Sequence, residues 1–196
     1  MPIEQSLIKI TKEATQKASL ALLKLTHQQA SIEFTKIEVG KVKDVFMKIN
    51  PESIVTGIYL PISGDAKGGA ILIFPEKVSY LLCDMLTGKK PGTTRQLNEH
   101  DKSALNEVGN IILGSILTVL SNNLKMKMIE HMPNFCLDML GAVVDQIIVQ
   151  FIQKSEEVLI IELVFNFSSP EVKGYVLIIF ETEEMKVLIK NLKEND

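Results

Sequence analysis

The chain has 196 residues, of which 46% are hydrophobic and 23% are charged, and its formal net charge at pH 7 is −3. This length is typical of one domain with its own core, and the apolar content excludes a disordered chain. The slightly acidic balance argues against general nucleic-acid binding, which requires a basic surface. Cys83 and Cys136 lie too far apart in the sequence for a zinc motif or a disulfide framework, which indicates a reduced, cytoplasmic protein.

The sequence predicts no segment that enters a membrane. Its first residues, Met1–Gln5, lack the basic and apolar regions of a signal peptide. The longest apolar run, Tyr175–Phe180, has six residues, whereas a helix needs about 20 to cross a bilayer. We therefore expect a cytoplasmic protein without membrane contacts.

In chain order, the apolar spacing first predicts a helix over residues 4–28. Three strands follow, and a hairpin-type turn at Ser63–Ala66 joins the last two; their ranges are 31–42, 54–62 and 70–74. Pro75 then opens a helix that extends to Leu86, because proline suits the first turn of a helix.

A second long helix is predicted from Asn98, its expected N-cap, to Leu124. We expect the later elements to be a strand, a short amphipathic helix, two strands and a closing helix, over residues 135–139, 141–152, 158–167, 173–180 and 182–192. The methionines at 126, 128 and 132 are expected to pack in strands or in the core.

The two parts of the sequence resemble each other. Lys67-Gly68 with Phe74 matches Lys173-Gly174 with Phe180 at an offset of 106 residues. At an offset of 94, four apolar residues of the first long helix fall on four of the second: Ala14, Ala18, Leu22 and Leu25 on Val108, Ile112, Ile116 and Val119. Both sets form one apolar stripe at about 100° per residue. Two similar halves with one shared core explain this pattern, and chance similarity of two amphipathic helices is the alternative.

Opposite the apolar stripe, the second long helix carries a polar face of Ser103, Glu107, Asn110 and Gly114. Their spacing places them within an arc of roughly 60°. Gly109 and Gly114 are unusual inside a helix, where each costs about 1 kcal/mol against alanine, and they allow another surface to approach closely. From spacing alone, this face either binds a partner or is an ordinary solvated surface.

The pattern Ser103-x3-Glu107-x2-Asn110-x22-Pro133 resembles the signature of the CheC/CheX/FliY phosphatases. The segments Thr56–Leu60, Leu72–Glu76 and Asp138–Ala142 also resemble CheC, so the similarity covers nearly the whole chain. The resemblance implies an α+β fold of two pseudo-symmetric α/β halves, 1–92 and 93–196. These halves share one sheet, on which the two long helices pack together as a single CheC-like domain.

The resemblance also implies an activity, namely hydrolysis of the aspartyl phosphate on the response regulator CheY. Glu107 would pair with a lysine of CheY, and Asn110 would orient the attacking water. Ser103, Gly114 and Pro133 would support the motif. The Mg²⁺ ion would belong to CheY, so no cofactor is expected in this chain.

The first half carries a changed copy of the motif. An offset of 94 places Lys9, Glu13, Gln16 and Val39 at the motif positions and Leu20 at that of Gly114. We predict one full site, with a degenerate one at Glu13 and Gln16.

Partners and alternatives follow from the same resemblance. The helix over 141–152 resembles the CheC surface that binds the deamidase CheD, and Asp145 is its test residue. The alternative to an enzyme is a degenerate CheC that mainly binds CheD or CheY. We expect a monomer or a weak dimer. A CheX-like homodimer is the third alternative, and it would require an exposed sheet edge for pairing.

Overall fold

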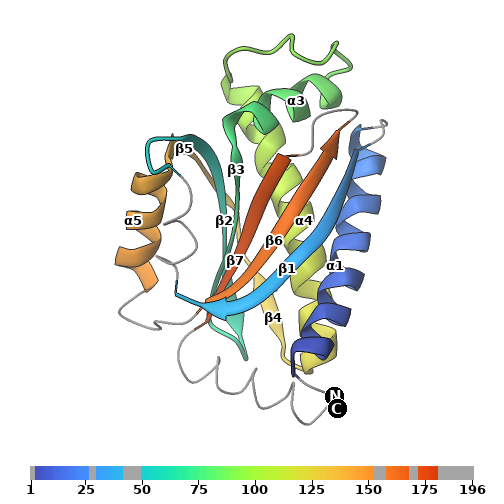
Figure 1. The fold of residues 1–196 in the computed structure, drawn as a ribbon, viewed down its shortest axis with the longest axis vertical. Helices are drawn as coiled ribbons and strands as arrows, with labels where there is room; N and C mark the ends of the chain where they lie inside the picture. Colours follow the sequence, from blue (N-terminus) through green and yellow to red (C-terminus); the bar gives the residue numbers. More distant parts are fainter. Residues whose placement is uncertain (1–2, 27–29, 42–49, 152–157, 168–171, 181–196) are drawn as a thin grey trace.

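A computed structural model describes residues 3–26, 30–41, 50–151, 158–167 and 172–180. They form an antiparallel seven-stranded sheet with helices on both faces (Figure 1). The described helices are α1 (Ile3–Thr26), α3 (Glu76–Leu86), α4 (Glu99–Leu124) and α5 (Leu140–Phe151). The strands are β1 (Ala30–Gly40), β2 (Ile54–Gly64), β3 (Gly68–Pro75), β4 (Met128–Glu130), β5 (Asn134–Met139), β6 (Val158–Phe167) and β7 (Val172–Phe180). The predicted α+β class is confirmed.

The sheet interleaves strands from both parts of the sequence. Its order is β1-β6-β7-β3-β2, and both β4 and β5 pair with the outer side of β2. β1 therefore extends the β6–β7 hairpin, whereas β5 extends the β2–β3 hairpin. β1, from the first part of the sequence, thus pairs with a hairpin of the second part, and β5, from the second part, pairs with a hairpin of the first. Neither part therefore has a separate sheet. The division into halves at residues 92 and 93 stays a prediction.

Both faces of the sheet are buried, which explains the nearly continuous apolar runs of its central strands. In β3, Leu72 and Phe74 belong to the main core, which also contains residues of α1, α3 and α4. Their neighbours Ile71 and Ile73 belong to a second apolar cluster with residues of α5. Because successive strand residues point to opposite faces, α5 covers the face opposite to α1, α3 and α4.

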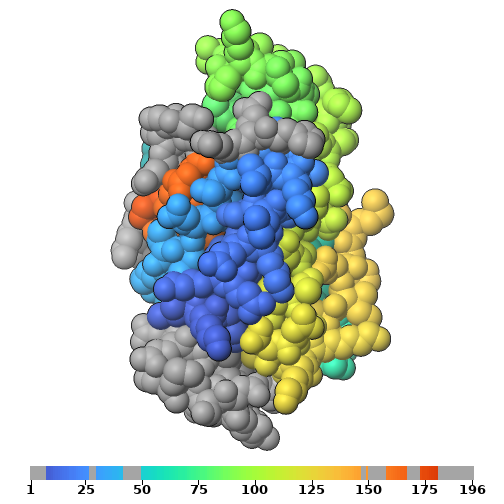
Figure 2. Space-filling view, turned by 90° about the vertical axis from the view of Figure 1, so that its right-hand side faces the viewer, coloured from blue at the N-terminus to red at the C-terminus, as the bar shows by residue number. Residues whose placement is uncertain are grey.

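The two long helices lie side by side on the same face of the sheet (Figure 2). Their predicted apolar stripes form this contact and the contact with the sheet. Ala14, Ala18 and Leu22 of α1 are at most 1% exposed, as are Val108 and the other stripe residues of α4. The predicted packing of the two helices is therefore confirmed.

Capping interactions fix the ends of α4. The Asn98 side chain accepts a hydrogen bond from the Asp101 amide (3.0 Å), and the Asp101 carboxylate accepts one from the Asn98 amide (3.1 Å). This capping box confirms the predicted start of the helix. At its other end, Lys125 adopts a left-handed conformation with φ of 51° and turns the chain back toward β4. By length and composition α4 resembles a membrane span, but half of that stretch is buried inside the protein, as in a core helix.

Some expectations differ from the structure. β4 has only three residues, too few for a periodic pattern, and the sequence analysis did not predict it. Met126 is buried and Met128 partly buried, but Met132 is 85% exposed, so its expected packing is wrong. Met132 projects from the short segment between β4 and β5, which has no apolar periodicity of its own. The predicted closing helix over 182–192 lies outside the described residues.

Candidate functional site

The candidate site is the outward face of α4. Ser103 and Glu107 are exposed there, and Asn110 is half-buried. Within the described part of the chain, neither the Glu107 carboxylate nor the Asn110 amide has a hydrogen bond or an ion pair. With respect to the described residues, both groups are therefore available to a partner. A free amide carries donors and an acceptor that can orient a water molecule, and a free carboxylate can bind a cation.

The hydroxyl of Ser103 is engaged within the helix. Its Oγ donates to the Glu99 carbonyl at 2.9 Å, one turn earlier. A groove of about 480 Å³ lies beside it, between the first turns of α4 and the aromatic and apolar side chains Phe135 and Leu137 of β5. A supporting role of Ser103, rather than a chemical one, stays a prediction.

Pro133 lies against α4 through a contact that the sequence analysis did not anticipate. The Asn106 side-chain Nδ2 donates to the Pro133 carbonyl at 3.3 Å. Because Asn106 directly precedes Glu107, this hydrogen bond holds the chain after β4 beside the candidate site. The position of Asn106 inside the motif could have marked it as a site residue. The spacing of the motif did not indicate that its side chain would reach Pro133.

The two glycines of α4 face this chain's own strands. A Cβ atom on the buried Gly109 would lie 2.5 Å from Ile58 Cδ1, so this glycine allows α4 to approach β2. A Cβ atom on Gly114 would lie 2.8 Å from Glu130 Oε2, next to β4. The sequence predicts that both glycines allow another surface to approach closely. At Gly109 that surface is the sheet beneath the helix, and at Gly114 it is the Glu130 side chain of β4.

The changed motif of the first half lies on the exposed side of α1. Lys9, Glu13 and Gln16 are all exposed. The Glu13 carboxylate forms an ion pair with Lys17 at 3.1 Å, four residues along the same helix. Leu20, at the position that corresponds to Gly114, is 59% exposed. The α1 face is therefore accessible, but its carboxylate already has a cation.

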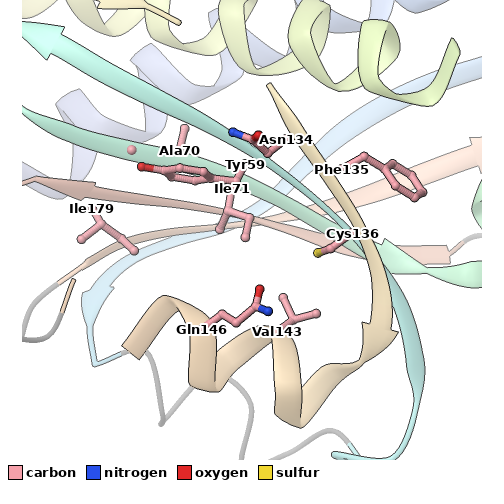
Figure 3. A pocket seen from close by; sticks show the side chains of 10 residues that line it. Tyr59, Ala70, Ile71, Asn134, Phe135, Cys136, Val143, Gln146 and Ile179 are labelled. Atoms are coloured by element: carbon pink, nitrogen blue, oxygen red, sulfur yellow. The ribbon is translucent and has the colours of Figure 1, made fainter. Parts of the chain in front are cut away.

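On the opposite face of the sheet, a cavity of about 360 Å³ lies under α5. Val143 and Gln146 of α5 point into it, toward Tyr59 and Cys136 on the strands (Figure 3). Burial raises the pKa of the Cys136 thiol, and burial raises the pKa of Cys83 to about 12. Both thiols are therefore protonated at neutral pH and are poor nucleophiles.

Asp145, the residue predicted for CheD binding, is exposed on α5. Within the described ranges, no group of three or more histidine, cysteine, aspartate or glutamate residues is arranged to hold a metal ion.

The segment that carries the candidate site matches a known family. Residues 101–133, which extend across the motif from Ser103 to Pro133, match the CheC-like family. The chain is also similar to the CheY-P phosphatase CheC of Bacillus subtilis (strain 168), with 28% identity over 138 residues. That alignment covers 68% of this chain and 66% of the Bacillus protein. The candidate site therefore lies within the segment that matches this family.

Two of the similar solved structures show the same fold as this chain. The crystal structure of Thermotoga maritima FliY has a TM-score of 0.78 at 20% identity, and the match covers 100% of this chain and 98% of FliY. The CheX–CheY–BeF3–Mg complex from Borrelia burgdorferi has a TM-score of 0.55 at 15% identity, with 86% and 96% of the two chains covered. The fold of FliY therefore extends over the whole described chain.

Proposed function

We propose that this CheC-like chain is a cytoplasmic phosphatase that hydrolyses the aspartyl phosphate of a CheY-type response regulator. The observation that carries the proposal is the outward face of α4, where Glu107 and Asn110 lie one turn apart without partners among the described residues. The match of this segment to the CheC-like family and the similarity to a CheY-P phosphatase support the same activity.

In the proposed mechanism, Glu107 forms an ion pair with a lysine at the regulator's active site and sets the register of α4 against it. Asn110 then hydrogen-bonds a water molecule and aims it at the phosphorus atom, in line with the bond to the aspartate. Phosphoryl transfer requires mainly positioning and charge stabilisation, so an amide and a carboxylate suffice on this side. The Mg²⁺ ion and the phosphate arrive with the regulator.

The α1 face fits this mechanism less well. Lys17 already neutralises Glu13, and the additional methylene of Gln16 displaces its amide from the position that an asparagine would occupy. We therefore propose one productive site per chain, on α4.

A binding protein without catalysis is the second candidate. The exposed Asp145 on α5 and the engaged carboxylate on α1 favour it. In that case the chain would bind the deamidase CheD or the regulator without accelerating hydrolysis, and Asp145→Lys would weaken CheD binding.

Phosphate release from phosphorylated CheY separates the two candidates. We expect Asn110→Ala to lower turnover by about 10²-fold, the scale for loss of one positioned catalytic group, and Glu107→Ala to weaken regulator binding. Asn122→Ala is the matched control, because Asn122 is an exposed asparagine on a later turn of the same helix. Wild-type turnover by Asn110→Ala would refute the mechanism. Binding of CheY or CheD without any acceleration would support the second candidate.

A further inference from the structure

The chain that follows α4 runs back along the helix beside the candidate site. Two contacts define its path. The Glu130 carboxylate lies against Gly114, one turn after Asn110, and the Pro133 carbonyl accepts a hydrogen bond from Asn106, one turn before it. The segment from Glu130 to Pro133 therefore passes at the level of Asn110. Figure 2 shows α4, in yellow-green, between α1 and the gold surface of the residues that follow it.

This segment is also attached to the sheet on its other side. Glu130 pairs with Ile62 of β2, and the His131 amide donates to the Pro61 carbonyl at 3.0 Å. The His131 ring nitrogen Nε2 lies 2.8 Å from the Ser63 hydroxyl. The backbone on both sides of Met132 is thus held by hydrogen bonds.

Met132 projects from this held backbone into solvent, and 85% of its surface is exposed. Methionine is enriched at protein interfaces, because its flexible and polarisable side chain adapts to an apolar partner surface. Since the backbone is already fixed, binding would order only the side chain, which lowers the entropic cost of the contact.

Glu130 occupies a space that Gly114 provides. A Cβ atom at position 114 would lie 2.8 Å from Glu130 Oε2, so any side chain there would displace the carboxylate. Glu130 is exposed as a residue, but desolvation of its carboxylate raises the pKa of Glu130. Within the described residues this carboxylate has no ion pair, so it can bind a cation that a partner supplies.

We propose that Glu130 and Met132 form a second strip of the surface that binds the receiver domain of the phosphorylated response regulator. Glu130 binds a basic side chain of that domain, and Met132 packs on an apolar patch beside it. The inference rests on the proposed function. The receiver domain is the expected occupant because the strip is continuous with Glu107 and Asn110, and because carboxylates then flank Asn110 on both sides.

Glu130 and Met132 are expected to affect the affinity for the regulator and not the rate of hydrolysis. They lie beside Asn110, which is proposed to orient the water, and do not take over its role. With the 196-residue chain and phosphorylated CheY, Glu130→Gln and Met132→Ser should each raise KM about tenfold, the scale of a 1.4 kcal/mol contact, with unchanged kcat. Glu130→Gln should also reduce the dependence of KM on salt. Glu52→Gln and Val149→Ser, at exposed positions elsewhere, are the matched controls.

A double-mutant cycle tests the role of Gly114. Gly114→Ala should raise KM in the wild-type background by displacing the Glu130 carboxylate, and it should have no further effect in a Glu130→Ala background. Since alanine is the better helix former, the urea midpoint should stay the same or rise, so misfolding cannot explain the loss.

The outcomes separate this inference from the proposed function. Direct binding to CheY that carries beryllium fluoride, a phosphate mimic, is measured alongside turnover. Wild-type KM and affinity in the Glu130 and Met132 variants would refute only the second strip, since the effect of Asn110→Ala on kcat would still support the phosphatase. Failure of the wild-type chain to bind the regulator would refute both.

Discussion

The two long helices of this chain carry similar residues at the motif positions, but the two glutamates have different surroundings. On α1 the motif glutamate, Glu13, is paired with Lys17 at 3.1 Å. On α4 the corresponding Glu107 is followed four residues later by Ile111, and it has no ion pair among the described residues. The two carboxylates thus differ because Lys17 lies one turn after Glu13, whereas the uncharged Ile111 lies one turn after Glu107.

The surroundings of the two helices differ as well. Gly114 of α4 makes room for Glu130, whereas the corresponding Leu20 of α1 places a large side chain in solvent. The apolar stripes of both helices are retained because both are buried in one core, where changes of volume destabilise. The outward residues diverge because substitutions at exposed positions change stability little. Packing in the shared core therefore constrains the buried residues of both helices, whereas their exposed residues are free to differ.

An exchange of the motif amides gives the largest expected effect. Asn110→Gln should lower turnover by about 10- to 100-fold, because a displacement of about 1 Å is enough to misplace the attacking water. Gln16→Asn should give no gain, since Glu13 stays paired with Lys17. Phosphate release from phosphorylated CheY measures both. A rate increase with Gln16→Asn would mean that the two helices are more alike than their contacts indicate.

The second largest effect is expected when the hydrogen bonds that hold the loop before α4 are removed. The buried Asp84 of α3 accepts hydrogen bonds from the Thr93 amide (2.9 Å), the Thr94 amide (2.9 Å) and the Thr94 hydroxyl (2.6 Å). Asp84→Ala leaves these donors without their acceptor and should lower the free energy of unfolding by about 2 kcal/mol. Urea unfolding near neutral pH measures this change. Asp65→Ala, which removes one exposed hydrogen bond from the Lys127 amide (2.9 Å), is the comparison and should have a smaller effect.

This stabilisation should depend on pH. Burial alone would raise the pKa of Asp84, but the hydrogen bonds from Thr94 and Thr93 outweigh it and hold the pKa below its usual value. The contribution is therefore complete above the unfolded pKa of about 3.9 and is lost as the pH falls through the lower folded value. The difference between wild type and Asp84→Ala should shrink on acidification. A constant difference would show that the carboxylate charge has no part in it.

The smallest effect concerns how closely each helix approaches the sheet. Gly109→Ala places a Cβ atom 2.5 Å from Ile58 and should destabilise the protein by about 1 kcal/mol, the overpacking cost minus the gain in helix propensity. In α1 the corresponding Thr15 is buried with its side chain accommodated, and its hydroxyl donates to the Thr11 carbonyl at 2.9 Å. Urea unfolding of Gly109→Ala beside Gly114→Ala, expected to be neutral or stabilising, tests this difference. Equal effects would refute it.

Much of the fold could be predicted from local patterns. The start of α4 at Asn98 follows from its capping residues, and the long helices and main strands follow from apolar periodicity. β4 could not be predicted, because three residues carry no period and the strand is defined by its pairing with β2. The exposure of Met132 was missed for the same reason, since it depends on the path between β4 and β5.

By itself, the sequence determined which residues of α4 face outward and that its motif is more complete than that of α1. Helical geometry fixes the direction of each side chain once the buried stripe is known. Only the tertiary structure decided what lies next to that face: the sheet under Gly109, the Glu130 carboxylate at Gly114 and the hydrogen bond from Asn106 to Pro133. These contacts join residues that are distant in sequence or belong to different elements, and residue spacing within one helix carries no information about them.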